Sequence, residues 1–152
     1  MSREERAKEY FLQGYACSQA VALAFADLTG LDEATLEKLT LPFGGGMGRL
    51  RLTCGALSGM AAIVGLLFAK EENTPENKKN VYAIVQKLCG EFQEQTGSLI
   101  CAEVLKGMNV SVEIGGNAEA RTAEYYKKRS CADMVALATQ ILEKYIQENK
   151  PL

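Results

Sequence analysis

The chain has 152 residues, of which 47% are hydrophobic and 24% charged, and its formal net charge is −2. This is the balance of a globular protein with a buried core, and a weakly acidic chain lacks the basic surface that nucleic-acid binding needs. No apolar run reaches the roughly 18 residues that span a bilayer, and the charged start lacks the apolar segment of a secretory signal, so we expect no membrane partner and a cytoplasmic location.

The first half of the chain predicts four helices, over residues 3–13, 15–26, 32–39 and 54–70. The first rests on the capping-box pattern of Ser2 with Glu5. The third is expected to turn Leu36 and Leu39 toward the core. The fourth begins at Cys54 and is apolar on nearly all sides, so it should be central.

The second half predicts four more helices, over residues 75–95, 98–105, 118–129 and 131–149. Thr74 as N-cap and Pro75 at the first helical position mark the start of the longest. Ser98 and Ser130 are expected to cap two of the others. Nothing repeats at a fixed period. The sequence therefore predicts an all-α, single-domain bundle of six to eight helices over residues 1–152.

The sequence contains no histidine. Its absence removes the commonest general base and the commonest metal ligand. It also excludes Ser-His-Asp and Cys-His catalysis and the Cys-x-x-Cys-His haem attachment. Any chemistry must therefore come from cysteine, carboxylates, lysine, tyrosine or a bound cofactor.

A glycine-dense loop precedes Cys54, with four glycines among residues 44–48. Glycine reaches positive φ without strain and lets other groups approach the backbone closely. We expect this loop to pack around a cofactor, with backbone N–H groups donating to sulfur, through Gly44, Gly45, Gly46, Gly48 and Arg49. A phosphate site is less favoured because the Gly-Lys-Ser/Thr end of a P-loop is missing. Arg49 and Arg51 either add positive charge near Cys54 or form a solvated pair.

Five cysteines are present, Cys17, Cys54, Cys89, Cys101 and Cys131. Three of them, Cys17, Cys54 and Cys131, fall at predicted helix starts, where the helix dipole favours a thiolate and lowers the thiol pKa. Cys101 is expected about one turn into its helix. Cys89 lies late in the long helix and is interpreted as a small apolar residue of the core. The wide spacing excludes a Cys-x-x-Cys zinc knuckle or thioredoxin-type motif.

Several stretches together resemble a known family. They are Cys17-Ser-Gln-Ala-Val21, the loop Phe43–Arg49, Cys54-Gly-Ala-Leu-Ser-Gly59, Gly97-Ser-Leu-Ile-Cys101, and Cys131 at the last helix. The chain resembles the bacterial C_GCAxxG_C_C family, described as redox-active proteins. One departure is that Thr53 precedes Cys54 where the family's name has glycine, and Gly55 follows it.

The resemblance implies a set of four key cysteines, Cys17, Cys54, Cys101 and Cys131, and leaves Cys89 out. The family is also similar to the cluster-binding part of split-Soret cytochromes. Since the haem-attachment motif is missing here, the resemblance implies an iron–sulfur site and no haem.

Three functional hypotheses follow. In the first, the four cysteines converge and ligate an iron–sulfur cluster that exchanges electrons with an unidentified donor or acceptor. In the second, the protein carries out metal-free thiol–disulfide or peroxide chemistry, with Cys54 and Cys17 as the catalytic residues. In the third, the chain is a helical binding module whose cysteines are structural. A homodimer through apolar helix surfaces is expected in addition.

Overall fold

All regular structure in the computed structural model, which describes residues 1–152, is helical apart from one isolated bridge between Thr53 and Ile100. The helices are α1 (Arg3–Leu12), α2 (Cys17–Leu23), α3 (Ala26–Thr29), α4 (Glu33–Thr40), the 3-10 helix η1 (Leu41–Phe43), α5 (Gly55–Phe68), α6 (Pro75–Thr96), α7 (Cys101–Gly107), α8 (Ala123–Lys128) and α9 (Cys131–Glu148). The all-α prediction is confirmed. The segment predicted as the second helix divides in two, because α2 ends at Leu23 and Phe25 leaves the helical conformation.

The caps expected near the starts of α1 and α6 are present. Ser2 and Glu5 form the reciprocal capping box, and the Thr74 hydroxyl accepts from the N–H of Asn77. These bonds satisfy donors that a helix start leaves without partners.

Two sequence predictions about helix ends and one about burial are wrong. The short helix starts at Cys101 and not at Ser98, because the bridge to Thr53 keeps Ile100 extended. The helix predicted over 118–129 is confined to α8, which the Thr122 side chain caps. Leu39 is 50% exposed, whereas Leu36 is fully buried as expected.

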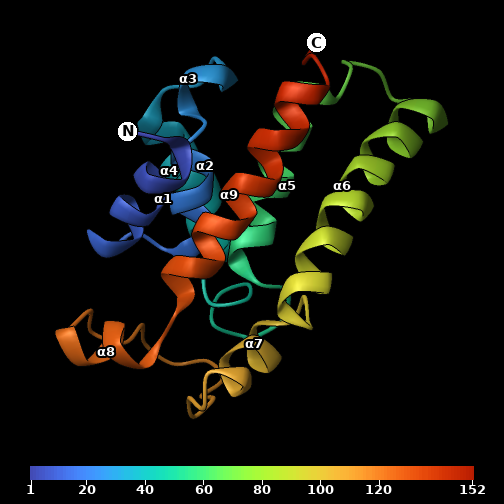
Figure 1. Ribbon diagram of the computed structural model, residues 1–152. Helices are drawn as coiled ribbons and strands as arrows, with labels where there is room; N and C mark the ends of the chain where they lie inside the picture. Colours follow the sequence, from blue (N-terminus) through green and yellow to red (C-terminus); the bar gives the residue numbers. More distant parts are fainter.

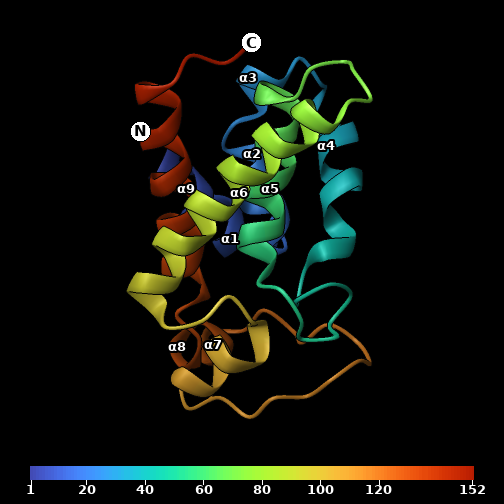
Figure 2. The ribbon, with the colours of Figure 1, turned by 90° about the vertical axis from the view of Figure 1, so that its right-hand side faces the viewer.

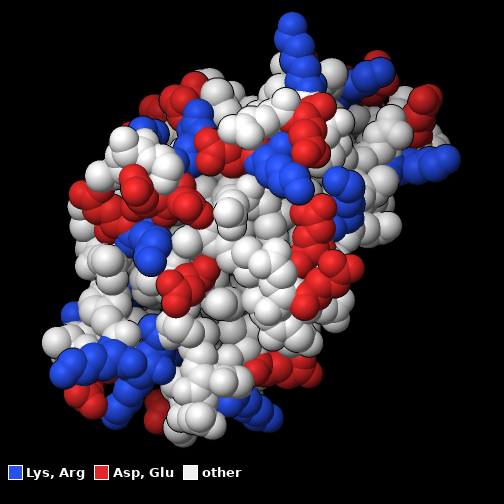
Figure 3. Space-filling model, viewed as in Figure 1, with Lys and Arg blue, Asp and Glu red and all other residues white.

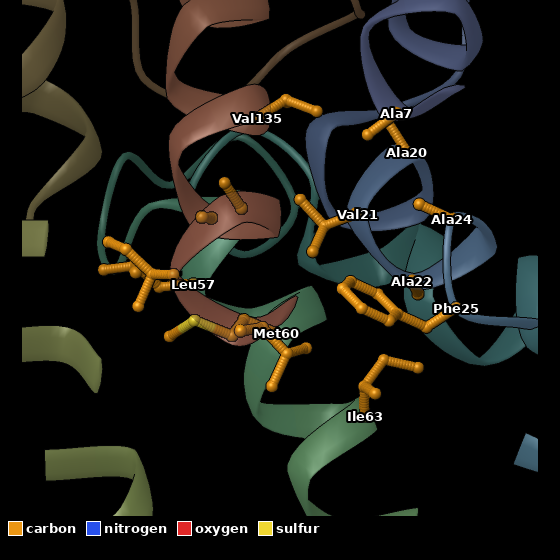
Figure 4. Packing of buried hydrophobic residues seen from close by; sticks show 14 of the residues in the cluster. Ala7, Ala20, Val21, Ala22, Ala24, Phe25, Leu57, Met60, Ile63 and Val135 are labelled. Carbon is orange, nitrogen blue, oxygen red and sulfur yellow. The ribbon is translucent and has the colours of Figure 1, made fainter. Parts of the chain in front are cut away.

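The core is built around α5, as its apolar sequence predicts. Leu57, Met60 and Ile63 of this helix are buried in one cluster with Val21 and Phe25, and Ile63 lies below Phe25 in the view of Figure 4. None of the helices combines the length and the apolarity that a bilayer span requires.

The starts of α5 and α9 lie at the same end of the molecule (Figure 1). In Figure 1, α5 and α9 both begin low in the view and run upward, and α7 and α8 lie below them. Figure 2 shows the same arrangement from the side, with α7 and α8 beneath the lower ends of α6 and α9. The loops that join these helices therefore meet at this lower end.

The crossing of α2 and α5 depends on Gly59. A Cβ atom at this position would collide with the carbonyl oxygen of Ser18 and would lie 3.1 Å from its Cα. Only glycine lets the two helix backbones approach this closely. The contact sets how far apart α2 and α5 lie, and therefore where Cys17 and Cys54 meet.

We predict that Gly59→Ala destabilises the protein by about 1–3 kcal/mol, because the backbone of α2 must move to accommodate the methyl group. Gly65→Ala, in the same helix, is the matched control, since a Cβ there meets no atom within 4 Å. Its higher helix propensity should raise the free energy of unfolding by up to about 1 kcal/mol. Urea denaturation of both variants measures the difference, and equal effects would contradict the assigned contact.

Candidate functional site

Four of the five cysteines stand at the N-termini of four different helices. Cys17, Cys101 and Cys131 are the first residues of α2, α7 and α9, and Cys54 is the N-cap of α5. The sequence predicts this position for three of them. The prediction that Cys101 lies about one turn into its helix is wrong, because α7 begins at Cys101 itself.

These four cysteines line one cavity of about 310 Å³. The four thiols are free, and Cys54 is the most buried of them. Cys89, on α6, is also free but does not line this cavity. Four of the five cysteines therefore share one cavity, and Cys89 lies outside it.

Backbone hydrogen bonds hold two of the cysteines next to each other. The N–H of Cys54 donates to the carbonyl of Leu99 at 2.8 Å, and the N–H of Cys101 donates to the carbonyl of Leu52 at 2.6 Å. Together with the Thr53–Ile100 bridge, they pair the segment before α5 with the segment before α7. The sequence offered no signal for this pairing, which joins positions almost 50 residues apart.

The glycine loop has an unusual backbone. Five successive residues, 45 to 49, have φ between 57° and 74°, and Arg51 has φ 62°. The left-handed conformation costs a residue with a Cβ about 1–2 kcal/mol. Three of these residues, Met47, Arg49 and Arg51, carry that cost. Such strain is found where surrounding contacts enforce a shape that function uses.

The loop backbone lies directly against the cysteines. A Cβ at Gly46 would lie 2.6 Å from the Cβ of Cys101, and a Cβ at Gly55 would collide with the sulfur of Cys17. Burial raises the pKa of the Cys17 thiol, and the nearby backbone amide of Gly45 opposes this by favouring the thiolate. Of the residues predicted to bind a cofactor, Gly44, Gly45, Gly48 and Arg49 line the cavity, whereas Gly46 packs behind Cys101.

The expected lowering of the thiol pKa at helix starts is wrong for this fold. Burial raises the pKa of Cys17 and of Cys54 above the ordinary range, and it raises the pKa of Cys131 to about 12. The neighbouring thiols of Cys17, Cys101 and Cys131 raise the pKa of Cys54 further. Desolvation and mutual repulsion thus outweigh the helix dipole. In the metal-free protein, burial therefore favours the protonated form of the Cys17, Cys54 and Cys131 thiols.

Positive charge surrounds the sulfurs. Four arginines line the cavity, Arg49, Arg51, Arg121 and Arg129, together with one carboxylate, Glu119. Arg129 pairs with Glu119 at 3.0 Å, and Arg49 lies 3.7 Å from Glu113. Arg51 and Arg121 have no carboxylate partner and donate to backbone carbonyls. The cavity therefore has an excess of positive charge and is suited to hold anionic groups.

Sequence reasoning missed the contribution of the segment between α7 and α9. Arg121 stacks on Phe11 at 4.3 Å and donates to the carbonyls of Phe11 and Tyr15, which fixes this segment against α1. Lys127 and Lys128 of α8 are exposed. Basic side chains gather on the surface over this part of the molecule (Figure 3, lower left). The basic composition of residues 121–129 was the available signal, but it did not reveal that Arg121 and Arg129 face the cysteines.

Comparison with known proteins gives one match. The family model described as "Putative redox-active protein (C_GCAxxG_C_C)" matches residues 15–145. No curated protein and no solved structure matches the chain. The family's pattern places glycine before the cysteine, whereas here Cys54 precedes Gly55. The fold explains why this order works, because the glycine at 55 leaves room for the Cys17 sulfur.

We predict that Gly46→Ala exposes the cysteine site. The added methyl group would push Cys101 and Leu52 away, and local opening should increase the alkylation rate of Cys101 by iodoacetamide about tenfold. Gly48→Ala is the matched control, because Gly48 is also left-handed but a Cβ there meets nothing closer than 4.0 Å. Mass spectrometry of the labelled peptides separates the two variants, and equal labelling would argue against the contact.

We predict that Cys131 of the reduced, metal-free protein ionises only at high pH. Its alkylation rate should keep rising toward a midpoint near pH 12 in the folded protein, whereas in urea the midpoint should return to about 8.5. The comparison uses pH midpoints and not absolute rates, because the reagent reaches a buried thiol more slowly at every pH. A midpoint below about pH 8 for Cys131 in the folded protein would instead support the prediction that the helix dipole lowers the thiol pKa.

Proposed function

Because the chain belongs to the C_GCAxxG_C_C family of putative redox-active proteins, we propose that its four convergent cysteines ligate an iron–sulfur cluster used for electron transfer. The main support is that Cys17, Cys54, Cys101 and Cys131 line one cavity from four separate helices. Both [2Fe–2S] and [4Fe–4S] clusters take four cysteine ligands. When bound, such a cluster would accept and release single electrons.

The donor set of the cavity fits this group. Its four thiols are free, and no histidine is available to replace one of them. Thiolates at four helix starts would gain from the helix dipoles and from the arginines around the cavity. The cost of ionising the buried thiols would be offset by bonds to iron, since a coordinating thiol is deprotonated outright.

The arrangement does not suit a single metal ion. No group of three or more cysteine or acidic side chains is placed to hold one ion, whereas a structural zinc site brings four ligands to about 2.3 Å from one centre. Each cysteine of a [4Fe–4S] site binds a different iron. The sulfurs around a cluster can therefore lie farther apart, at the edges of a cavity.

The metal-free alternative has less support. An attacking cysteine needs a thiolate at neutral pH, but burial raises the pKa of Cys54 and Cys17, the two residues predicted to be catalytic. The electron donor or acceptor, the cytoplasmic location and the homodimer stay predictions from the sequence.

Anaerobic purification tests the proposal. We expect a brown protein that contains iron and acid-labile sulfide, and we expect Cys101→Ser to lose most of both. A colourless wild-type protein that cannot be reconstituted with iron and sulfide would overturn the proposal.

Cys89→Ser is the matched control for this experiment. Cys89 is a free cysteine of the same chain that lies outside the cavity, so its replacement should leave iron and sulfide content unchanged. Equal loss from Cys89→Ser and Cys101→Ser would indicate a general effect on folding and not the removal of a ligand.

A further inference from the structure

One buried charge in the cavity has no acidic partner. Arg51 is 6% exposed, and it forms no ion pair with a carboxylate. Its Nε donates to the carbonyl of Glu113 at 3.0 Å, and its Nη1 lies 3.7 Å from the sulfur of Cys101. A buried guanidinium is costly unless an anion compensates it. The nearest candidate is the sulfur of Cys101.

The backbone conformation of Arg51 is a second observation that supports a role for its charge. Arg51 has φ 62°, a conformation that glycine adopts freely and that costs arginine about 1–2 kcal/mol. The segment keeps a charged residue there although both its backbone and its burial are unfavourable. A guanidinium stays charged at all accessible pH values and presents several donors in a fixed plane. It is therefore suited to hold a permanent positive charge beside the sulfur.

We propose that Arg51 sets the reduction potential of the cysteine site through its contact with Cys101, an inference that rests on the proposed redox function. When an external one-electron donor reduces the site, one electron is gained, no bond to Arg51 forms or breaks, and the site becomes more negative by one charge. A nearby positive charge stabilises this reduced state. Net charge and hydrogen bonds to the sulfurs are among the factors that set cluster potentials. Arg51 thus raises the potential and acts as a positioning residue.

Arg49 is the internal control for this assignment. It also has a left-handed backbone, with φ 65°, and its Nε also donates to a backbone carbonyl, that of Gly115, at 3.0 Å. Unlike Arg51, it has Glu113 as an acidic neighbour and makes no hydrogen bond to a cysteine sulfur. The two residues therefore share strain and anchoring but differ in the contact with sulfur.

The test is a potentiometric titration of the cluster absorbance with redox dyes in wild type, Arg51→Gln, Arg51→Lys and Arg49→Gln. We expect Arg51→Gln to shift the reduction equilibrium at least tenfold toward the oxidised form, about 59 mV for a one-electron couple. Arg49→Gln should shift it much less, and Arg51→Lys, which keeps the charge, should lie between Arg51→Gln and wild type. A merely structural role would not produce this order.

Equal potentials in wild type and Arg51→Gln, with iron and sulfide present in both, would overturn the inference and leave the proposed function intact. If wild type takes up no cluster, the proposed function fails, and the inference about Arg51 is overturned with it because it concerns the one-electron reduction of that cluster.

Discussion

The site depends on how closely α2 and α5 approach each other. No side-chain atom fits at Gly55 or Gly59, because the sulfur of Cys17 and the carbonyl of Ser18 occupy the space that a Cβ would need. This contact brings the first turn of α2 against the start of α5, so that Cys17 and Cys54 share one cavity. Since α5 is also the centre of the hydrophobic core, the geometry of the site is tied to the packing of the whole molecule.

Burial gives the cysteines their chemical character. At an exposed helix start the dipole would favour a thiolate, but here desolvation dominates and raises the pKa of Cys17, Cys54 and Cys131. A metal-free thiol enzyme would need the opposite shift. A cluster site does not, because bonds to iron replace the proton. Burial therefore disfavours the metal-free function and is compatible with the cluster.

Arginines provide the counter-charge that four sulfurs would need. They come from two segments that are distant in sequence. The glycine loop supplies Arg49 and Arg51, and the segment between α7 and α9 supplies Arg121 and Arg129. Hydrogen bonds from Arg49 and Arg51 to the carbonyls of Gly115 and Glu113 also join these two segments. Arg49 and Arg51 thus hold the two segments together and also contribute positive charge to the cavity.

The sequence by itself determined the all-α class, most helix boundaries and the position of Cys17, Cys54 and Cys131 at helix starts. Caps such as Ser2 and Thr74, and the apolar pattern of α5, act within a few residues, so they are readable along the chain. The pairing of Thr53 with Ile100, the left-handed run at 45–49 and the inward positions of Arg121 and Arg129 were decided only by the tertiary structure. These features, like the raised thiol pKa values, depend on contacts between segments far apart in the chain, and no local pattern encodes how deeply a sulfur is buried.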